Sequence, residues 1–168
     1  MDKWPLAYFI TVACYGTHLY GHPSGSVDRR HNRYLEPRLP PDPDRCAKLI
    51  RRLKYDPFLL SSPQRDAVLR AITEVCSHRG WRLRAAHVRT THFHSIVSAA
   101  CCPEHIMKDL KSCATMGLRK AHLVPPRRTC WTRHGSTIYL WTDKQFEEAM
   151  DYVRNRQGKP MAVYPTET

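Results

Sequence analysis

Hydrophobic residues repeat with two different periods along this chain, and the period separates predicted strands from predicted helices. Four segments are continuously apolar or alternate apolar with polar residues, as strands do: Leu6–Tyr15, Trp81–Arg89, His92–Ala99 and Ser136–Trp141. Thr90 and Thr91 separate the middle two, which predicts a hairpin. Three longer segments repeat apolar residues at helical spacing and begin or end at Pro or Gly: Ser62–Gly80, Pro103–His122 and Asp143–Gly158.

A segment of different composition interrupts this pattern after the first strand. From Gly16 to about Pro43 the chain is rich in Gly and Pro and contains the basic and aromatic run Ser26–Tyr34. This basic and aromatic run is equally compatible with a segment that binds the stem of a nucleic-acid hairpin and with a loop exposed to solvent. Asp42 and Pro43 then predict the start of a short helix with one apolar and one basic face. We therefore expect residues 16–60 to be an insertion of loop and short helix.

The order strand, insertion, helix, strand, strand, helix, strand, helix is typical of one fold class. It predicts a ferredoxin-like (RRM-like) α+β sandwich, in which a four-stranded antiparallel sheet carries helices on one face and a C-terminal helix is added. A length of 168 residues suits one compact domain, so we expect residues 1–168 to form a single domain.

Charge and cysteine content narrow the class of protein. The chain has 27 Lys and Arg against 15 Asp and Glu, a net charge of +12, which predicts an anionic partner. No segment reaches the ~18 apolar residues of a membrane span, and Leu6–Tyr15 lacks the flanks of a signal peptide. The chain has seven cysteines and no recognisable export signal, so we expect free thiols and not disulfides. We expect a cytoplasmic protein with no membrane partner.

His92-Phe93-His94, on the predicted third strand, is the first candidate for chemistry. Side chains alternate along a strand, so both imidazoles point to one face, an arrangement that can hold one metal ion. With ten histidines in the chain, chance gives about 0.6 such pairs, so the motif by itself favours two polar residues on an exposed sheet face.

A wider set of residues supports the metal-binding interpretation. In order along the chain these are Gly80–Arg84, His92–Val97, Leu110–Lys111, Trp131–Gly135 and Glu148–Val153. Together they resemble the transposase domain of the REP-associated tyrosine transposases. More broadly, they resemble single-strand transposases with a His-hydrophobic-His (HUH) motif and one catalytic Tyr. The resemblance runs from about Tyr8 to Val163, and it rests on the order and spacing of the motifs.

The resemblance implies a divalent metal (Mg²⁺ or Mn²⁺) and cleavage and rejoining of single-stranded, hairpin-flanked DNA through a covalent 5′-phosphotyrosine. His92 and His94 match the metal-binding pair, and Tyr152 matches the nucleophile. If the histidines are left aside, Tyr152 is explained equally well as a side chain that borders the hydrophobic core. Related enzymes work as monomers or as dimers, so a homodimer is compatible with the resemblance.

The third metal ligand is where this sequence departs from the family. The family usually places Gln or Asn four residues after the Tyr, and here that residue is Arg156, which cannot bind a cation. Gln157 is favoured because the last helical turn before Gly158 can loosen, and Asn155 and Glu148 remain alternatives. The Arg156 substitution also supports a second hypothesis, a catalytically degenerate protein that binds hairpin DNA or RNA.

Other residues are candidates for nucleic-acid contact. A set of basic side chains is expected either to contact the phosphate groups of a nucleic acid or simply to be exposed to solvent. These are Arg84, Lys108, Lys111, Arg119, Lys120, Arg127, Arg128 and Arg133. Trp131 and Trp141 fit the stacking of unpaired bases or, more commonly, a place in the core. A third hypothesis is an RNA-binding sheet of RNP type, for which Phe93 and Tyr139 are the candidate aromatics.

Overall fold

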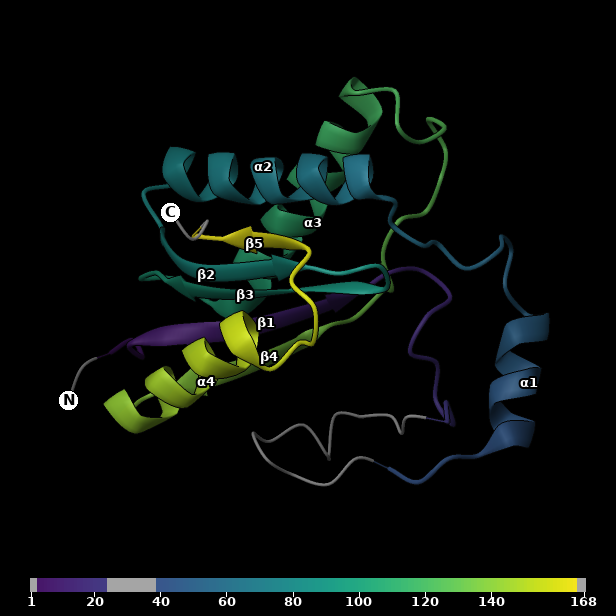
Figure 1. Cartoon of the computed structure of the whole chain (residues 1–168), viewed down its shortest axis with the longest axis horizontal. Coiled ribbons are helices and arrows are strands. Elements are labelled where there is room, and N and C mark those ends of the chain that lie inside the picture. The colour runs from purple at the N-terminus through teal and green to yellow at the C-terminus, as the bar shows by residue number, and fades with distance from the viewer. Residues whose placement is uncertain (1–2, 24–38, 166–168) are drawn as a thin grey trace.

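The computed structural model describes residues 3–23 and 39–165 and arranges them as a sheet with helices on both faces (Figure 1). In chain order the elements are β1 (Ala7–Ala13), α1 (Pro43–Arg51), α2 (Ser62–His78), β2 (Arg82–Val88), β3 (His92–Ser98), α3 (Pro103–Lys120), β4 (Ser136–Leu140), α4 (Asp143–Asn155) and β5 (Ala162–Tyr164). Every predicted helix and strand is present. The predicted basic run Ser26–Tyr34 lies outside the described residues.

The sheet is antiparallel, with the strand order β4-β1-β3-β2-β5. The order of its first four strands, with α2 and α3 as crossovers, matches the α+β arrangement that the sequence predicts. The expected number of four strands is wrong, because β5 adds a fifth along the edge of β2. It pairs Val88 with Ala162 and Ala86 with Tyr164. Three residues are too few to carry a periodic signal, so this strand is defined by its partner edge.

The two faces of the sheet are covered by different helices. Helices α2 and α3 cover one face, where Tyr8, Ile10 and Val12 of β1 join the larger core cluster. Helix α4 covers the other face, where its Ala149 and Val153 pack on a second cluster of strand residues (Figure 1). Alternation along each strand assigns side chains to one helix layer or the other. The α4 face is the one that carries the candidate chemistry.

This packing decides two questions about aromatic residues that the sequence left open. Phe93 is fully buried in the larger cluster, so the RNP-type sheet, which needs exposed aromatics on its central strands, is wrong. Trp131 is only 7% exposed, and its ring packs against Phe58 and Phe93. Its indole N–H lies 3.0 Å from Thr115 Oγ1, so Trp131 is a core residue and does not stack on bases.

Two expectations from composition can be compared with the fold. All seven cysteines are free, as expected. Within the described ranges, no helix is both long enough and apolar enough to cross a membrane.

Candidate active site

His92 and His94 lie side by side on the α4 face of the sheet. Both are on β3, a central strand, and their ring centroids are 4.6 Å apart. His94 is 6% exposed, whereas His92, at the start of the strand, is half-buried. The prediction that the two imidazoles share a face is confirmed in its geometry.

Two threonine hydroxyls lie against the Nδ1 atoms of these imidazoles. Thr11 is the register partner of His94 on β1, and its Oγ1 lies 2.8 Å from His94 Nδ1. Thr91 precedes β3, and its Oγ1 lies 3.0 Å from His92 Nδ1 and 3.0 Å from His18 Nε2. The His18 ring lies edge-on to the His92 ring, with centroids 5.2 Å apart. Hydrogen bonds on Nδ1 fix the ring orientation and direct each Nε2 away from the threonine.

Helix α4 places Tyr152 beside this pair. Ala149 and Val153 are fully buried against the sheet, so Tyr152 lies at the edge of the apolar stripe. Its ring packs against Phe9 and His94, with centroid distances of 5.9 Å and 5.7 Å. Within residues 3–23 and 39–165, no group hydrogen bonds the Tyr152 hydroxyl. The phenol therefore borders the core and the imidazoles at the same time.

The C-terminal end of α4 folds Gln157 back toward the imidazoles. The helix ends at Asn155, and Gly158 turns the chain with a φ of 73° that favours glycine. Gln157 Nε2 donates to the Tyr152 carbonyl at 3.3 Å. Gln157 also raises the pKa of both His92 and His94, against the larger effect of burial, so its side chain acts on both imidazoles. The amide oxygen takes no part in the contact with Tyr152, and it is the atom of this side chain that can bind a cation.

The alternatives for the third ligand lie elsewhere. Asn155 and Arg156 both contact the Asp151 carboxylate, at 2.9 Å and 2.6 Å. Both side chains are exposed and belong to the outer face of α4. Glu148 is half-buried one turn before Tyr152, and no hydrogen bond joins it to either imidazole in the described part of the chain. Of the three candidates, Gln157 is the one placed at the histidines.

Burial keeps the imidazoles neutral. Burial, followed by the nearby His18 and Arg89, lowers the pKa of His92 to about 4. Burial also holds the pKa of His94 well below its usual range, with His92 as the next cause. A neutral imidazole has a free lone pair for a metal ion, whereas a protonated one has none.

The donor set fits a divalent metal ion. Two neutral imidazoles and an amide oxygen are suitable ligands for Mg²⁺ or Mn²⁺ when water completes the shell. Among the residues that the structure describes, no three His, Cys, Asp or Glu side chains converge on one point. Gln157, the favoured third ligand in the sequence, is of another residue type, and its side chain acts on the pKa of both imidazoles.

The basic residues predicted to follow phosphates are divided between the two faces. Lys108, Arg119 and Lys120 are exposed on α3, across the sheet from the histidines. Arg127 and Arg133 are exposed in the segment between α3 and β4. The sheet therefore separates α3, and the cations on it, from the candidate site.

Three other predicted basic residues have structural partners. The Lys111 ammonium donates to the carbonyls of Thr132, Arg133 and His134, at 2.9, 3.1 and 3.3 Å, and so uses its three protons within the protein. Arg84 lies over the Phe146 ring at 5.0 Å, and Arg128 lies over the rings of Tyr15, Tyr55 and Phe58.

Several residues at the site do not stand out in the sequence. Thr11 reaches His94 through strand register, and His18 reaches His92 through the path of the insertion. Arg89 follows β2, and its guanidinium donates to the Lys159 carbonyl at 2.6 Å and lowers the pKa of His92. The only local signal for Arg89 is its place next to the predicted hairpin turn.

Comparisons with known proteins bear on the fold. No family model matches the chain, and no curated protein matches it. A solved structure of a REP-associated tyrosine transposase bound to a REP hairpin is similar, with a TM-score of 0.50 and 15% identity, over 91% of this chain and 70% of that one. A candidate transposase from Deinococcus radiodurans R1 gives a TM-score of 0.47 and 14% identity, over 93% of this chain and 98% of that one. The chain therefore shares the fold of a REP-associated tyrosine transposase, as the resemblance in the sequence predicts.

Proposed function

We propose that this protein is a metal-dependent tyrosine transposase, an endonuclease that cleaves and rejoins single-stranded, hairpin-flanked DNA. The observation that carries the proposal is the convergence of side chains from β3, from α4 and from the segment just after α4. The ring centroids of His92 and His94 on β3 are 4.6 Å apart, Tyr152 of α4 packs on His94, and Gln157, two residues beyond α4, acts on the pKa of both imidazoles. We further propose that residues 1–168 act as one domain, with residues 16–60 inserted.

In this proposal His92, His94 and Gln157 hold Mg²⁺ or Mn²⁺. When bound, the metal ion polarises the scissile phosphate and neutralises its charge. The imidazoles do not need to move a proton, because burial already keeps them neutral. The Tyr152 ring packs against both Phe9 and His94, whose own ring centroids are 5.3 Å apart, and these contacts limit the positions of its hydroxyl.

Tyr152 is the nucleophile. Its hydroxyl oxygen attacks the phosphorus, the bond from phosphorus to the 3′ oxygen breaks, and the phenol proton leaves to solvent as the 3′ oxygen gains one. The products are a 5′-phosphotyrosine and a free 3′-OH. Because the phosphodiester is retained on Tyr152, another 3′-OH can reverse the step without a nucleotide cofactor.

The proposal of a DNA partner rests on the net charge of the chain and on its fold. A net charge of +12 on 168 residues favours a polyanion. The similar transposase is bound to a REP hairpin, which supports a hairpin with an unpaired flank as the substrate of this chain. A homodimer stays a prediction.

The test is formation of a covalent protein–DNA adduct. The chain is incubated with end-labelled hairpin DNA that has an unpaired flank, with Mn²⁺, with Mg²⁺ or with EDTA, and the adduct is followed on denaturing gels. We expect an adduct that needs the metal ion and is lost in Tyr152→Phe. Tyr139→Phe, which removes an exposed hydroxyl on β4, is the matched control and should retain it.

The same assay tests the third ligand. Gln157→Ala should weaken Mn²⁺ binding about 10–100-fold, whereas Asn155→Ala and Glu148→Ala should leave it within about twofold. Absence of an adduct with either metal ion on a set of hairpins that the chain does bind would contradict the enzyme. The degenerate hairpin-binding protein would then be the better account.

A further inference from the structure

Helix α1 has a strip of exposed cations that the proposed chemistry does not use. At 100° per residue, Arg45, Lys48, Arg51 and Arg52 lie within an arc of about 120°, and all four are exposed. Asp44 in the first turn is the acidic residue on this side of the helix. Within the described residues, no ion pair neutralises any of these four cations. Such a strip faces water at little cost and attracts phosphate groups.

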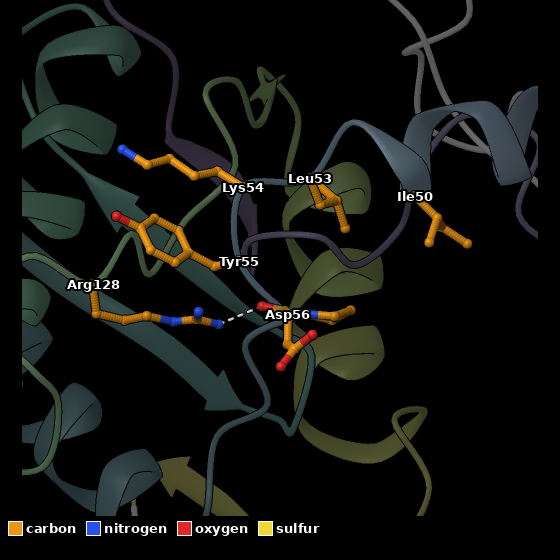
Figure 2. Close-up of a pocket in the computed structure, with 7 residues that line it drawn as sticks. Ile50, Leu53, Lys54, Tyr55, Asp56 and Arg128 are labelled. Carbon is orange, nitrogen blue, oxygen red and sulfur yellow. Dashed lines mark hydrogen bonds between the residues drawn. The ribbon is translucent and has the colours of Figure 1, made fainter.

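A basic pocket continues this strip beyond the C-terminal end of α1. The pocket has a volume of about 400 Å³ and is lined by Ile50, Leu53, Lys54, Tyr55, Asp56, Pro57 and Arg128. Figure 2 shows Lys54 and Arg128 above and below the Tyr55 ring in that view. Each cation lies 5.4 Å from the Tyr55 ring centroid. Arg128 also donates to the Asp56 carbonyl, which fixes its guanidinium at the pocket wall.

Hydrogen bonds tie this strip and pocket to the end of the sheet that carries His92. Lys54 N donates to the Tyr15 hydroxyl at 2.9 Å, and Phe58 N donates to the Tyr15 carbonyl at 2.8 Å. Leu60 N donates to the carbonyl of Thr90, in the hairpin turn just before His92, at 2.8 Å. Helix α1 projects from this end of the sheet, apart from the other helices (Figure 1).

The N-terminal side of α1 is held at the same end. Asp42 N donates to the Gly21 carbonyl at 3.1 Å, and Gly21 follows His18, whose ring packs on His92. Gly21 has a φ of 82°, and a side chain there would collide with the Asp42 carbonyl, so the close approach requires glycine. Both ends of α1 are therefore connected to the surroundings of the candidate active site.

We infer that the basic strip of α1, with Lys54 and Arg128 at its end, binds the phosphate backbone of the duplex stem in a hairpin DNA. The inference rests on the proposed function, because it assigns the stem to α1 while the unpaired flank enters the site at His92. Seven residues of helix span about 10 Å, which matches about three phosphates of one strand. Phosphate contacts position the DNA without reading its sequence.

The alternative surface is α3, where the sequence predicted phosphate contacts. Its exposed cations, Lys108, Arg119 and Lys120, are separated by a gap of ten residues after the first, and the Lys111 ammonium is occupied by three carbonyls. Asp109 on the same helix pairs with Arg79 at 2.7 Å. Helix α3 also lies across the sheet from the histidines. The observations therefore favour α1 as the stem-binding surface.

Two matched triple variants test the inference. One is Arg51→Gln, Arg52→Gln and Lys54→Gln, and the control is Lys108→Gln, Arg119→Gln and Lys120→Gln. Each removes three exposed cations. Affinity for a labelled hairpin DNA is measured by fluorescence anisotropy between 50 and 200 mM NaCl. We expect the α1 variant to bind at least about tenfold more weakly, with a log–log salt slope smaller by about 2–3, and the α3 variant to stay within about threefold.

Equal affinity of the α1 variant and the parent chain would overturn the inference, as would a larger loss in the α3 variant. Adduct formation on a short unpaired oligonucleotide separates this outcome from failure of the proposed function. The α1 variant should form that adduct as the parent does, because its substitutions do not touch His92, His94 or Tyr152. If neither protein forms an adduct but the salt slopes differ as expected, the enzyme is contradicted and the stem-binding surface stands.

Discussion

Each candidate metal-binding imidazole has a threonine hydroxyl on its Nδ1 atom. If Nε2 is to offer its lone pair to a metal ion, Nδ1 must carry the proton and donate it to the threonine oxygen. For His94 the acceptor is Thr11 at 2.8 Å, and for His92 it is Thr91 at 3.0 Å. The proton of the Thr91 hydroxyl is then available for His18 Nε2, also at 3.0 Å. In that tautomer each threonine oxygen is placed to accept the Nδ1 proton of its imidazole.

Removing either hydroxyl should weaken metal binding without unfolding the chain. Thr91→Val keeps the shape of the side chain but loses the acceptor, so His92 should populate both tautomers. We expect Mn²⁺ affinity to fall about 10-fold, as measured by calorimetry, and Thr91→Ser to restore it. In the metal-free protein, ¹⁵N NMR should show His92 protonated at Nδ1 in the parent and mixed in the variant. Since Thr11 serves only His94, Thr11→Val should alter His94 and leave His92 unchanged; a single tautomer of His92 in all variants would contradict this role.

At this scale the sequence specified the direction of side chains but not their partners. The alternation of β3 was enough to predict that His92 and His94 share a face. The pairing of Thr11 with His94 depends on the register between β1 and β3, which no local pattern encodes. The sequence favours Gln157 because Gly158 follows it, and Gly158 does have a positive φ, of 73°.

At the scale of elements, Lys111 shows how a helix holds the segment that leads into a strand. Its ammonium binds three consecutive carbonyls, from Thr132 to His134, just before β4. Burial lowers its pKa, which is consistent with a cation inside a ring of carbonyls and away from water. Helix α3 and the start of β4 are thus connected by a single side chain.

Lys111→Met should destabilise the protein, because three carbonyls lose a charged donor while the volume of the side chain is kept. We expect the free energy of unfolding to fall by about 1–3 kcal/mol in urea denaturation. Lys108→Met, one turn earlier and exposed on the same helix, is the control and should change it by less than about 0.5 kcal/mol. Equal effects of the two substitutions would show that the carbonyl contacts add no stability.

The hydrophobic periods predicted these elements well but not the roles of their polar faces. Both Lys108 and Lys111 lie on the polar side of α3 by spacing, yet one faces water and the other faces a loop. The short strand β5 was missed because three residues have no measurable period. Trp131 illustrates the same limit, since its partners come from three other segments.

At the scale of the whole molecule, three histidines on the two adjacent strands β2 and β3, two of them buried and His92 half-buried, link stability to pH. His87 is fully buried, and its ring hydrogen bonds to the Val153 carbonyl at 3.1 Å and to Met161 N at 3.1 Å. Burial lowers the pKa of His87, of His92 to about 4, and of His94 well below 6.5. The unfolded chain, with pKa values near 6.5, binds these protons first as the pH falls.

The metal-free protein should therefore lose stability as the pH falls below about 6.5. Each histidine that stays neutral in the fold contributes a slope of about 1.4 kcal/mol per pH unit between its two pKa values. Urea denaturation in EDTA at pH 7.5, 6.0 and 5.0 measures this loss. His92→Gln should remove one histidine's part of the slope above pH 4. A free energy of unfolding that stays constant from pH 7.5 to 5.0 would contradict the claim that the fold keeps these histidines in their neutral form.

The sequence by itself determined the elements other than β5, their order, the positive charge and the shared direction of His92 and His94. All of these follow from residue identity and from the local periods of strand and helix. Only the tertiary structure decided that Tyr152 packs on His94, that α3 lies across the sheet from the histidines, and that hydrogen bonds connect the ends of α1 to the end of the sheet that carries His92. These depend on which face of the sheet each helix covers, and that choice is made by packing between distant segments. Local sequence does not record it, because the same amphipathic helix can cover either face.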